Sequence, residues 1–126
     1  MNHNAVLAKL RMKSGQRAII IGAPDSYKPV LAAIPEGVEV AETLEGQFDF
    51  IQVFVTQKGD AERQAPALKA AMKRGALLWV SYPKGKSIPT DLNRDILYAA
   101  LANFGLQAIA NVAVDDVWSA LRFKIS

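Results

Sequence analysis

Arg-Ala-Ile-Ile-Ile-Gly, residues 17–22, is the stretch of sequence that decides the fold class. Its β-branched residues are framed by Ser14-Gly15 before the run and by Gly22-Ala23-Pro24 after it. A short apolar run with such borders is typical of a strand buried on both faces of a parallel sheet. Residues 48–55 and 76–81 have the same character. We therefore expect three parallel strands whose carboxyl ends meet at one edge of the sheet.

The segments around these strands carry helical patterns. Residues 4–13 and 26–34 place apolar side chains at helical spacing, and residues 37–41 between them read as a short strand. The clearest helix follows the third strand, where Thr90 or Asp91 is expected to cap its first turn. These helices are expected to cover the sheet.

A further helix follows the second strand, with Leu68 and Met72 on one face and Gly75 at its end. Pro66 lies inside this segment and cannot donate a backbone hydrogen bond. We therefore expect the regular part of the helix to begin only around Ala65.

The last part of the chain has a different pattern. Residues 106–114 and 117–125 are two extended runs separated only by Asp115-Asp116, which is the spacing of a hairpin. Together with the alternating strands and helices, this order predicts an α/β fold: a three-layer, Rossmann-like, mostly parallel sheet with helices on both faces and a C-terminal antiparallel hairpin. Residues 1–126 are expected to form one domain.

Composition excludes several chemistries. The chain has 126 residues, 51% of them hydrophobic, and no apolar run approaches the roughly 18 residues that span a bilayer. The first residues lack the apolar stretch of a secretory signal, so we expect a cytoplasmic protein without a membrane partner. Cysteine is absent, which excludes disulfides and thiolate nucleophiles. His3 is the single histidine, so neither a histidine-based triad nor a histidine metal site is expected.

Charge is unevenly distributed although the formal net charge is only +3. Residues 1–35 carry five cations and one anion, residues 36–62 one cation and seven anions, and residues 63–94 seven cations and one anion. Such blocks either recruit anions or are simply solvated helix faces. Nucleic-acid binding is not expected, because the net charge is small and aromatic residues do not alternate with the cations.

The loop predicted after the third strand, residues 82–89, contains Gly85-Lys86-Ser87. A phosphate-binding P-loop needs a second glycine where Val80 stands, so this motif fails. The Tyr82 and Lys86 spacing of short-chain dehydrogenases fails as well, because Pro83 breaks the helix that would align them.

The position of this loop still matters, because open α/β sheets bind ligands at the carboxyl ends of their strands. The alternative is that the lysines are solvated, that Tyr82-Pro83 is a rigid turn, and that Asn93 and Arg94 cap or brace the following helix. The predicted ligand site comprises Asp25, Ser26, Tyr27, Tyr82, Lys84, Lys86, Ser87 and Arg94.

Five other residues invite a functional interpretation. Asp115-Asp116 is expected to form a turn and not a pair of catalytic carboxylates, because adjacent strand residues point to opposite faces. Trp79 and Trp118 lie inside apolar strands and are expected to fill core or interface volume. Asp49 lies between two phenylalanines, where burial without a partner is unfavourable, so it is expected to face either the end of the sheet or a backbone donor.

The order of elements in the second half of the chain, from residue 48 to residue 125, resembles the closing half of the Rossmann-like class I methyltransferases. The resemblance implies a glycine-rich loop after the first strand for S-adenosylmethionine and an acidic residue after the second for its ribose. Here the loop reads Gly22-Ala23-Pro24-Asp25-Ser26, with one glycine and a proline, and Glu42 is a weak substitute for the acid. We therefore do not expect a working methyltransferase.

The amino-acid sequence itself is similar to that of a family of short bacterial proteins of unknown function. The matching stretches are Ile21-Gly22-Ala23-Pro24, residues 78–85 with residues 91–95, and residues 114–123. This resemblance supports the fold and a bacterial cytoplasmic setting but implies no activity.

Three hypotheses remain open. The first is a small module that binds a small anionic ligand at the predicted site, with no cofactor and no metal. The second is a compact enzyme acting on an anionic metabolite, in which Lys84 or Lys86 binds charge and Asp25 or Tyr82 moves a proton. The third is a protein-interaction module that forms a homo-oligomer through a sheet edge or the Trp118 face of the hairpin.

Overall fold

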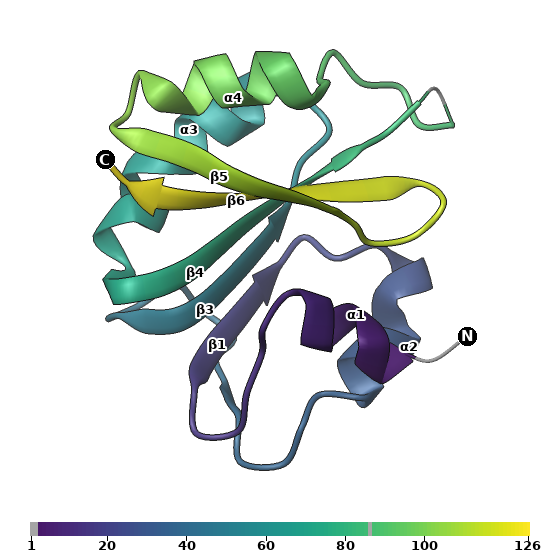
Figure 1. Ribbon diagram of the computed structural model, residues 1–126, viewed down its shortest axis with the longest axis vertical. Coiled ribbons are helices and arrows are strands. Elements are labelled where there is room, and N and C mark those ends of the chain that lie inside the picture. Colours follow the sequence, from purple (N-terminus) through teal and green to yellow (C-terminus); the bar gives the residue numbers. More distant parts are fainter. Residues whose placement is uncertain (1–2, 86) are drawn as a thin grey trace.

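A mixed sheet of six strands forms the centre of the part of the chain described by the structure, a computed structural model covering residues 3–85 and 87–126 (Figure 1). The elements in chain order are α1 (His3–Lys9), β1 (Arg17–Ile21), the short 3-10 helix η1 (Asp25–Tyr27), α2 (Lys28–Ala32), β2 (Glu39–Val40), β3 (Phe48–Phe54), α3 (Lys58–Ala70), β4 (Met72–Pro83), α4 (Arg94–Ala102), β5 (Leu106–Ala113) and β6 (Trp118–Ile125). The strand order across the sheet is β2-β1-β3-β4-β6-β5.

The three apolar runs are parallel neighbours, as predicted. In register, Ile19 of β1 lies beside Ile51 of β3, and Ile51 lies beside Leu78 of β4. β6 runs antiparallel to both β4 and β5, so the C-terminal hairpin is confirmed. Its second strand lies inside the sheet and its first strand forms the edge.

Two buried clusters lie on opposite sides of the sheet. Alternate residues of β3 and β4, such as Ile51 and Leu78, pack against α3 and α4, whose buried side chains include Leu68 and Leu97. The intervening residues, such as Phe50 and Trp79, pack with α1, η1 and α2. Figure 1 shows α3 and α4 together at the top of the view and α1 and α2 together at the bottom. Each fully buried leucine contributes about 1.5–3 kcal/mol by leaving water.

The expected start of α3 was wrong, because the helix begins at Lys58 and continues through Pro66. Ala61, Ala65 and Leu68 bury one face of the helix from its first turn onward. Pro66 itself is exposed, so the carbonyl that loses its partner can bond to water. Burial of the apolar face thus outweighs the missing hydrogen bond.

The expected end of α3 was also wrong. The helix ends at Ala70, and both Met72 and Gly75 belong to β4. The β3–β4 register advances two residues from Phe48 to Phe50 but five from Met72 to Leu77, so residues 73–76 form a bulge. Gly75 has a φ of 79°, which its missing side chain permits, and it serves this bulge instead of ending a helix.

The loop after β4 is shorter than expected. Tyr82 and Pro83 remain in the strand because they pair with Ser119 and Trp118 of β6. α4 is capped by Asn93, whose Oδ1 accepts from the backbone N of Ile96 at 2.8 Å.

The two residues expected to cap α4 have other partners. Asp91 accepts from the backbone N of Lys58 at 2.7 Å and so serves the first turn of α3. The hydroxyl of Thr90 donates to the carbonyl of Thr56. Both contacts join the loop before α4 to the segment that connects β3 with α3.

The leading helix is shorter than expected and ends at Lys9. The backbone N of Met12 bonds to the carbonyl of Leu7 at 3.0 Å, and Arg11 has a φ of 65°. This left-handed helix ending is one that normally favours glycine. Among the described residues, no helix is both long enough and apolar enough to span a membrane.

Candidate functional site

The carboxyl ends of β1, β3 and β4 lie at one edge of the sheet, because these three strands are parallel neighbours. We call this edge the crest and define it as residues 22–28, 55–58, 84–85 and 87–90. The sequence places its predicted ligand residues mostly here. The structure buries Tyr27 and Tyr82, and of the described residues in the predicted set only Lys84 lines a groove.

Tyr27 belongs to the core beneath the crest. Its ring meets Phe54 edge-on, with centroids 4.9 Å apart, and Phe54 meets Trp118 in the same way at 5.0 Å. All three side chains are buried, which places Trp118 in the core. These aromatic contacts join η1, β3 and β6.

A buried polar chain fixes the same tyrosine to the sheet. The Tyr27 hydroxyl donates to Gln52 Oε1 at 2.9 Å, and Gln52 Nε2 donates to Ser81 Oγ at 3.1 Å. Burial raises the pKa of Tyr27 to about 12; the Gln52 hydrogen bond opposes this rise and the charge of Asp115 adds to it. In this position the hydroxyl is already engaged and is not presented to a ligand.

Gly22 opens the loop after β1 and has a φ of 72°. A Cβ atom at this position would lie 3.2 Å from the carbonyl oxygen of Phe54. The glycine is therefore required by its backbone conformation and by its close approach to β3.

Tyr82 lies on the opposite face of the sheet from Tyr27. It is 4% exposed, and its hydroxyl lies 3.4 Å from Asn111 Oδ1, to which Ser119 Oγ also donates at 3.1 Å. Tyr82 packs in the cluster with α3 and α4, whereas Tyr27 packs in the cluster with α1 and α2. One ligand at a single surface cannot contact both hydroxyls.

The remaining predicted residues differ in exposure. Asp25, Ser26 and Ser87 are exposed, and Asp25 lies 3.9 Å from Lys28 in an ion pair open to solvent. Arg94 is exposed at the start of α4 and lies 3.4 Å from Asp95. Lys86 lies outside the described residues.

Lys84 is the predicted residue that lines a groove. The groove has a volume of about 330 Å³ and lies between α1 and the hairpin turn, with Lys9, Lys84, Asp115 and Asp116 as its charged residues. Lys84 is half-buried, and its backbone N bonds to the carbonyl of Val117 at 2.8 Å. Lys9 Nζ lies 3.3 Å from the carbonyl of Ala113.

The two aspartates of this groove form the turn of the hairpin, as predicted. Asp115 Oδ1 accepts from the backbone N of both Val117 and Trp118 at 2.8 Å. Sequence reasoning placed Asp116 in the turn but did not connect the turn with Lys84. It also missed Lys9, because no local pattern indicates that a leading helix packs beside a turn more than 100 residues later.

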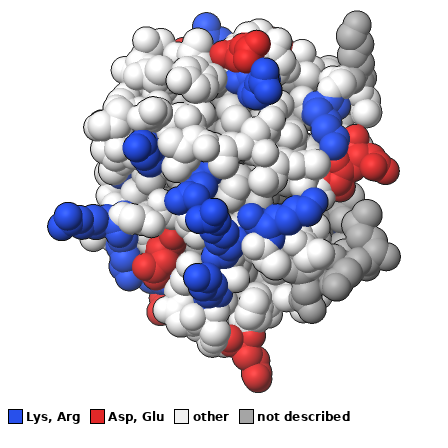
Figure 2. Space-filling model, in the orientation of Figure 1, with Lys and Arg blue, Asp and Glu red and all other residues white. Residues whose placement is uncertain are grey.

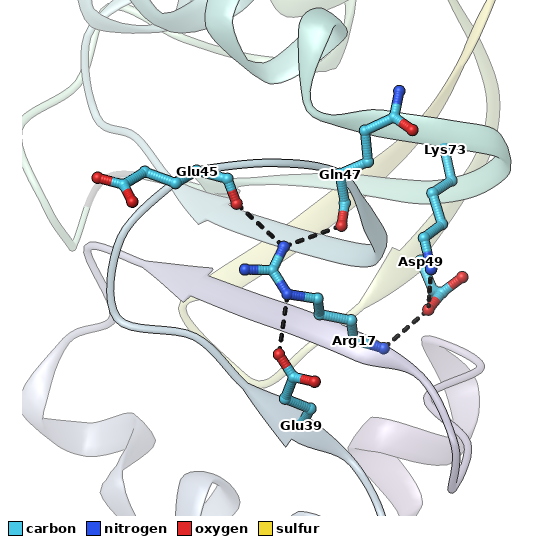
Figure 3. Close-up of polar contacts among 6 residues, drawn as sticks. All are labelled: Arg17, Glu39, Glu45, Gln47, Asp49 and Lys73. Carbon is cyan, nitrogen blue, oxygen red and sulfur yellow. Dashed lines mark hydrogen bonds and ion pairs between the residues drawn. The ribbon is translucent and has the colours of Figure 1, made fainter.

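A second polar cluster occupies the opposite edge of the sheet, around Arg17 (Figure 3). Arg17 Nε pairs with Glu39 at 2.9 Å, Nη1 donates to the carbonyls of Glu45 and Gln47, and the guanidinium lies 4.0 Å from the Phe48 ring centre. The Nε and Nη1 atoms of Arg17 thus both have acceptors within the protein (Figure 3). This cluster therefore joins the starts of β1 and β3 and is not free for a ligand.

Asp49 belongs to the same cluster. Its Oδ2 accepts from the backbone N of Arg17 at 2.8 Å and lies 3.4 Å from Lys73 Nζ (Figure 3). Of the two surroundings expected for this carboxylate, a backbone donor is confirmed. Within residues 3–85 and 87–126, no three acidic or histidine side chains are grouped in a way that could hold a metal ion.

The fold is similar to that of solved methyltransferases. A SAM-dependent methyltransferase from Aquifex aeolicus superposes with a TM-score of 0.70 at 15% identity, over 99% of this chain and 90% of that one. A TehB-like SAM-dependent methyltransferase from Corynebacterium glutamicum gives 0.62 at 12% identity, over 100% and 89%. A ribosomal protein L11 methylase from Lactobacillus delbrueckii subsp. bulgaricus gives 0.61 at 13%, over 98% and 77%.

No family model matches the sequence, and no curated protein matches it either. At these identities, likeness to solved structures shows the fold alone. The chain therefore has a methyltransferase-like Rossmann fold, which agrees with the resemblance of its second half. The likeness to these structures does not extend to an activity of this chain.

Proposed function

We propose that the protein is a small-ligand-binding module that takes an anionic metabolite in the groove beside Lys84, at the carboxyl edge of the sheet. The observation that carries this proposal is the groove itself, which contains Lys9 and Lys84 where open α/β sheets bind ligands. Its volume of about 330 Å³ is within the range of small-molecule sites.

The charges of the groove narrow the class of ligand. Lys9 and Lys84 attract a carboxylate or phosphate, whereas Asp115 and Asp116 repel a second negative group. A ligand that carries an ammonium or hydroxyl donor beside its anionic group fits this lining better than a simple dianion. Amino acids and hydroxy acids are such ligands.

We also propose that the module does not transfer methyl groups. The loop that would approach S-adenosylmethionine has one glycine, and Pro24 removes a backbone donor from it. The conformation of Gly22 is explained by its approach to Phe54, and Tyr27 is already bonded to Gln52. Asp25 and Tyr82, the residues considered for proton transfer, do not line the Lys84 groove.

A thermal-shift screen followed by calorimetry tests both proposals. The panel contains S-adenosylmethionine, amino acids, hydroxy acids and phosphorylated metabolites. A zwitterionic or hydroxylated anion should raise the melting temperature, and Lys84→Ala should weaken its binding by at least about tenfold, as expected for a lost charged hydrogen bond.

Arg63→Ala is the matched control, because Arg63 is an exposed cation on α3, which packs on the other face of the sheet. It should leave binding unchanged. Binding that survives Lys84→Ala, or a panel without any hit at millimolar concentration, would refute the ligand proposal. Methyl transfer from S-adenosylmethionine to any acceptor would refute the second.

Self-association is a second candidate, favoured by one observation on β5. This edge strand has eight residues without a charge or proline, and Ile109 on it is 41% exposed. Edge strands are normally protected by charges, prolines or bulges, and β5 has only the register irregularity between Ala108 and Ala110. β2 at the other edge is only two residues long. A strand of this kind can pair with the same strand of a second copy.

Analytical ultracentrifugation tests this candidate. Dimers at micromolar concentration should dissociate in Ile109→Lys, because two lysines would then face each other across the two-fold axis. Tyr98→Lys introduces the same charge at an exposed residue of α4 and should leave the dimer intact. A monomer at all concentrations would exclude pairing through β5.

A further inference from the structure

Cations from distant parts of the sequence gather on the face of the molecule that carries α1. Figure 2 shows Lys and Arg side chains across the middle of the visible face, with most Asp and Glu toward its margins. The chain contributes to this face from the end of α1 and from β6. The net charge of +3 does not reveal this concentration, because it averages the face with the acidic segment around β2.

Two arginines, Arg11 and Arg122, lie on the side of the sheet that α1 covers. Arg122 of β6 is the cross-strand neighbour of Trp79 in β4, and the side chains of such neighbours share a face of the sheet. The indole Nε1 of Trp79 donates to the carbonyl of Leu10 at 2.8 Å. Arg11 directly follows Leu10, so Trp79 holds both arginines on the same side of the sheet.

Neither guanidinium has a partner among the described residues. No ion pair or side-chain hydrogen bond involves Arg11 or Arg122, and the Nε of Arg122 is buried without an acceptor. Burial lowers the pKa of Arg122, and the nearby charge of Arg11 lowers it further. Two like charges side by side destabilise the fold unless something compensates them.

The backbone adds a second unfavourable feature at the same place. Arg11 has a φ of 65° at the end of α1, a position where glycine is the preferred residue. An arginine here is less stable than glycine would be. Strained residues of this kind are often retained for binding.

We propose that Arg11 and Arg122 form a binding site for a phosphate group, separate from the Lys84 groove. Guanidinium groups are planar forks that donate two hydrogen bonds to a phosphate, and two of them can hold one anion from two sides. A bound phosphate would accept from the terminal amino groups of the two guanidiniums and would screen their two like charges from each other.

The surface beyond this pair fits a larger phosphate ligand. Lys124 lies two residues after Arg122 on the same face of β6 and lines a groove of about 350 Å³ with Arg74 and the rest of the β4 bulge. The phosphate can belong to a small metabolite or to the backbone of a single-stranded nucleic acid. The chemistry at the two arginines is the same for both sources.

Arg11→Gly is the decisive variant, because it removes one guanidinium and relieves the backbone at the same time. The variant should unfold at the same temperature as the wild type or at a higher one, while its affinity for phosphate falls by about tenfold or more. An Arg11 without a role in binding would give the first result without the second, and an Arg11 that stabilises the fold would lower the unfolding temperature when it is replaced. Arg122→Gln should weaken binding as well, and Arg63→Ala is the control with the same loss of charge.

Two probes distinguish the sources: inorganic pyrophosphate by calorimetry, and a fluorescein-labelled ten-nucleotide oligouridine by anisotropy. Oligouridine binding whose salt dependence falls by about 0.7 per guanidinium removed would assign the site to a nucleic-acid backbone. Pyrophosphate binding without oligouridine binding would assign it to a small metabolite. Wild-type protein that binds neither probe at millimolar concentration, or an Arg11→Gly variant that binds as the wild type does, would overturn the proposal.

Discussion

Replacing Gln52 by leucine tests how the loop after β1 is held on the sheet. Gln52 is fully buried and connects the Tyr27 hydroxyl with Ser81 through bonds of 2.9 and 3.1 Å. Leucine has a similar volume but cannot accept or donate. The substitution therefore leaves the Tyr27 hydroxyl buried without its partner and removes the donor from Ser81.

The expected loss of stability follows from these two contacts. A buried polar group that loses its partner destabilises a protein by about 1–3 kcal/mol, and two are affected here. We expect Gln52→Leu to lower the free energy of unfolding by about 2–4 kcal/mol. The double variant Gln52→Leu with Tyr27→Phe removes the stranded hydroxyl and should regain at least about 1 kcal/mol, because replacing both partners by apolar groups is nearly neutral.

Urea unfolding followed by tryptophan fluorescence measures these differences, because Trp79 and Trp118 are both buried. Gln107→Leu, at an exposed position of β5, is the matched control and should change stability by less than about 0.5 kcal/mol. If the double variant is no more stable than Gln52→Leu alone, the tyrosine and glutamine do not act as a buried pair. Tyr27 would then not hold the loop after β1 on the sheet through Gln52.

Three further predictions concern the same fold. Burial raises the pKa of Tyr27 from 10.0 to about 12, so its contribution to the free energy of unfolding is complete below pH 10 and is lost as the pH rises toward 12. Over this range the free energy of unfolding, measured by urea titration, should fall by about 2–3 kcal/mol more in the wild type than in Tyr27→Phe. Gly22→Ala should destabilise by about 1–3 kcal/mol, measured by thermal unfolding, because its φ is 72° and its Cβ would approach Phe54; an unchanged melting temperature would contradict this. Asn93→Ala should remove the cap of α4 and lower stability by about 1 kcal/mol in urea, whereas Asn93→Asp should retain most of it.

The sheet could be predicted from the sequence because its signals are local. The β-branched run of β1 and the two apolar runs of the hairpin specify strands whatever lies beside them. Pro66 misled the prediction because its effect depends on its side of the helix, which is the exposed one here. Thr90 and Asp91 resemble caps of α4 but bond to Thr56 and to Lys58 instead. Asn93, which the alternative interpretation of this segment names as a cap, is the residue that caps the helix.

The site could be predicted only in part. The convergence of the loops follows from parallel strands, and Lys84 does line a groove at the predicted edge. The position of Tyr82 depends on how far β4 continues, and this is set by pairing with β6, far along the chain. Lys9 of α1 meets the hairpin turn only after folding, so no sequence window contains both sides of the Lys84 groove.

The position of β6 has a consequence for how the protein is made. Of the strands in the described chain, β6 is the last in sequence, yet it lies between β4 and β5. While the polypeptide leaves the ribosome, the long strand β4 therefore has an open flank until about forty further residues have been synthesised. Chaperone dependence during translation should accordingly be greatest in that interval, and a nascent chain arrested before Trp118 should aggregate once it is released.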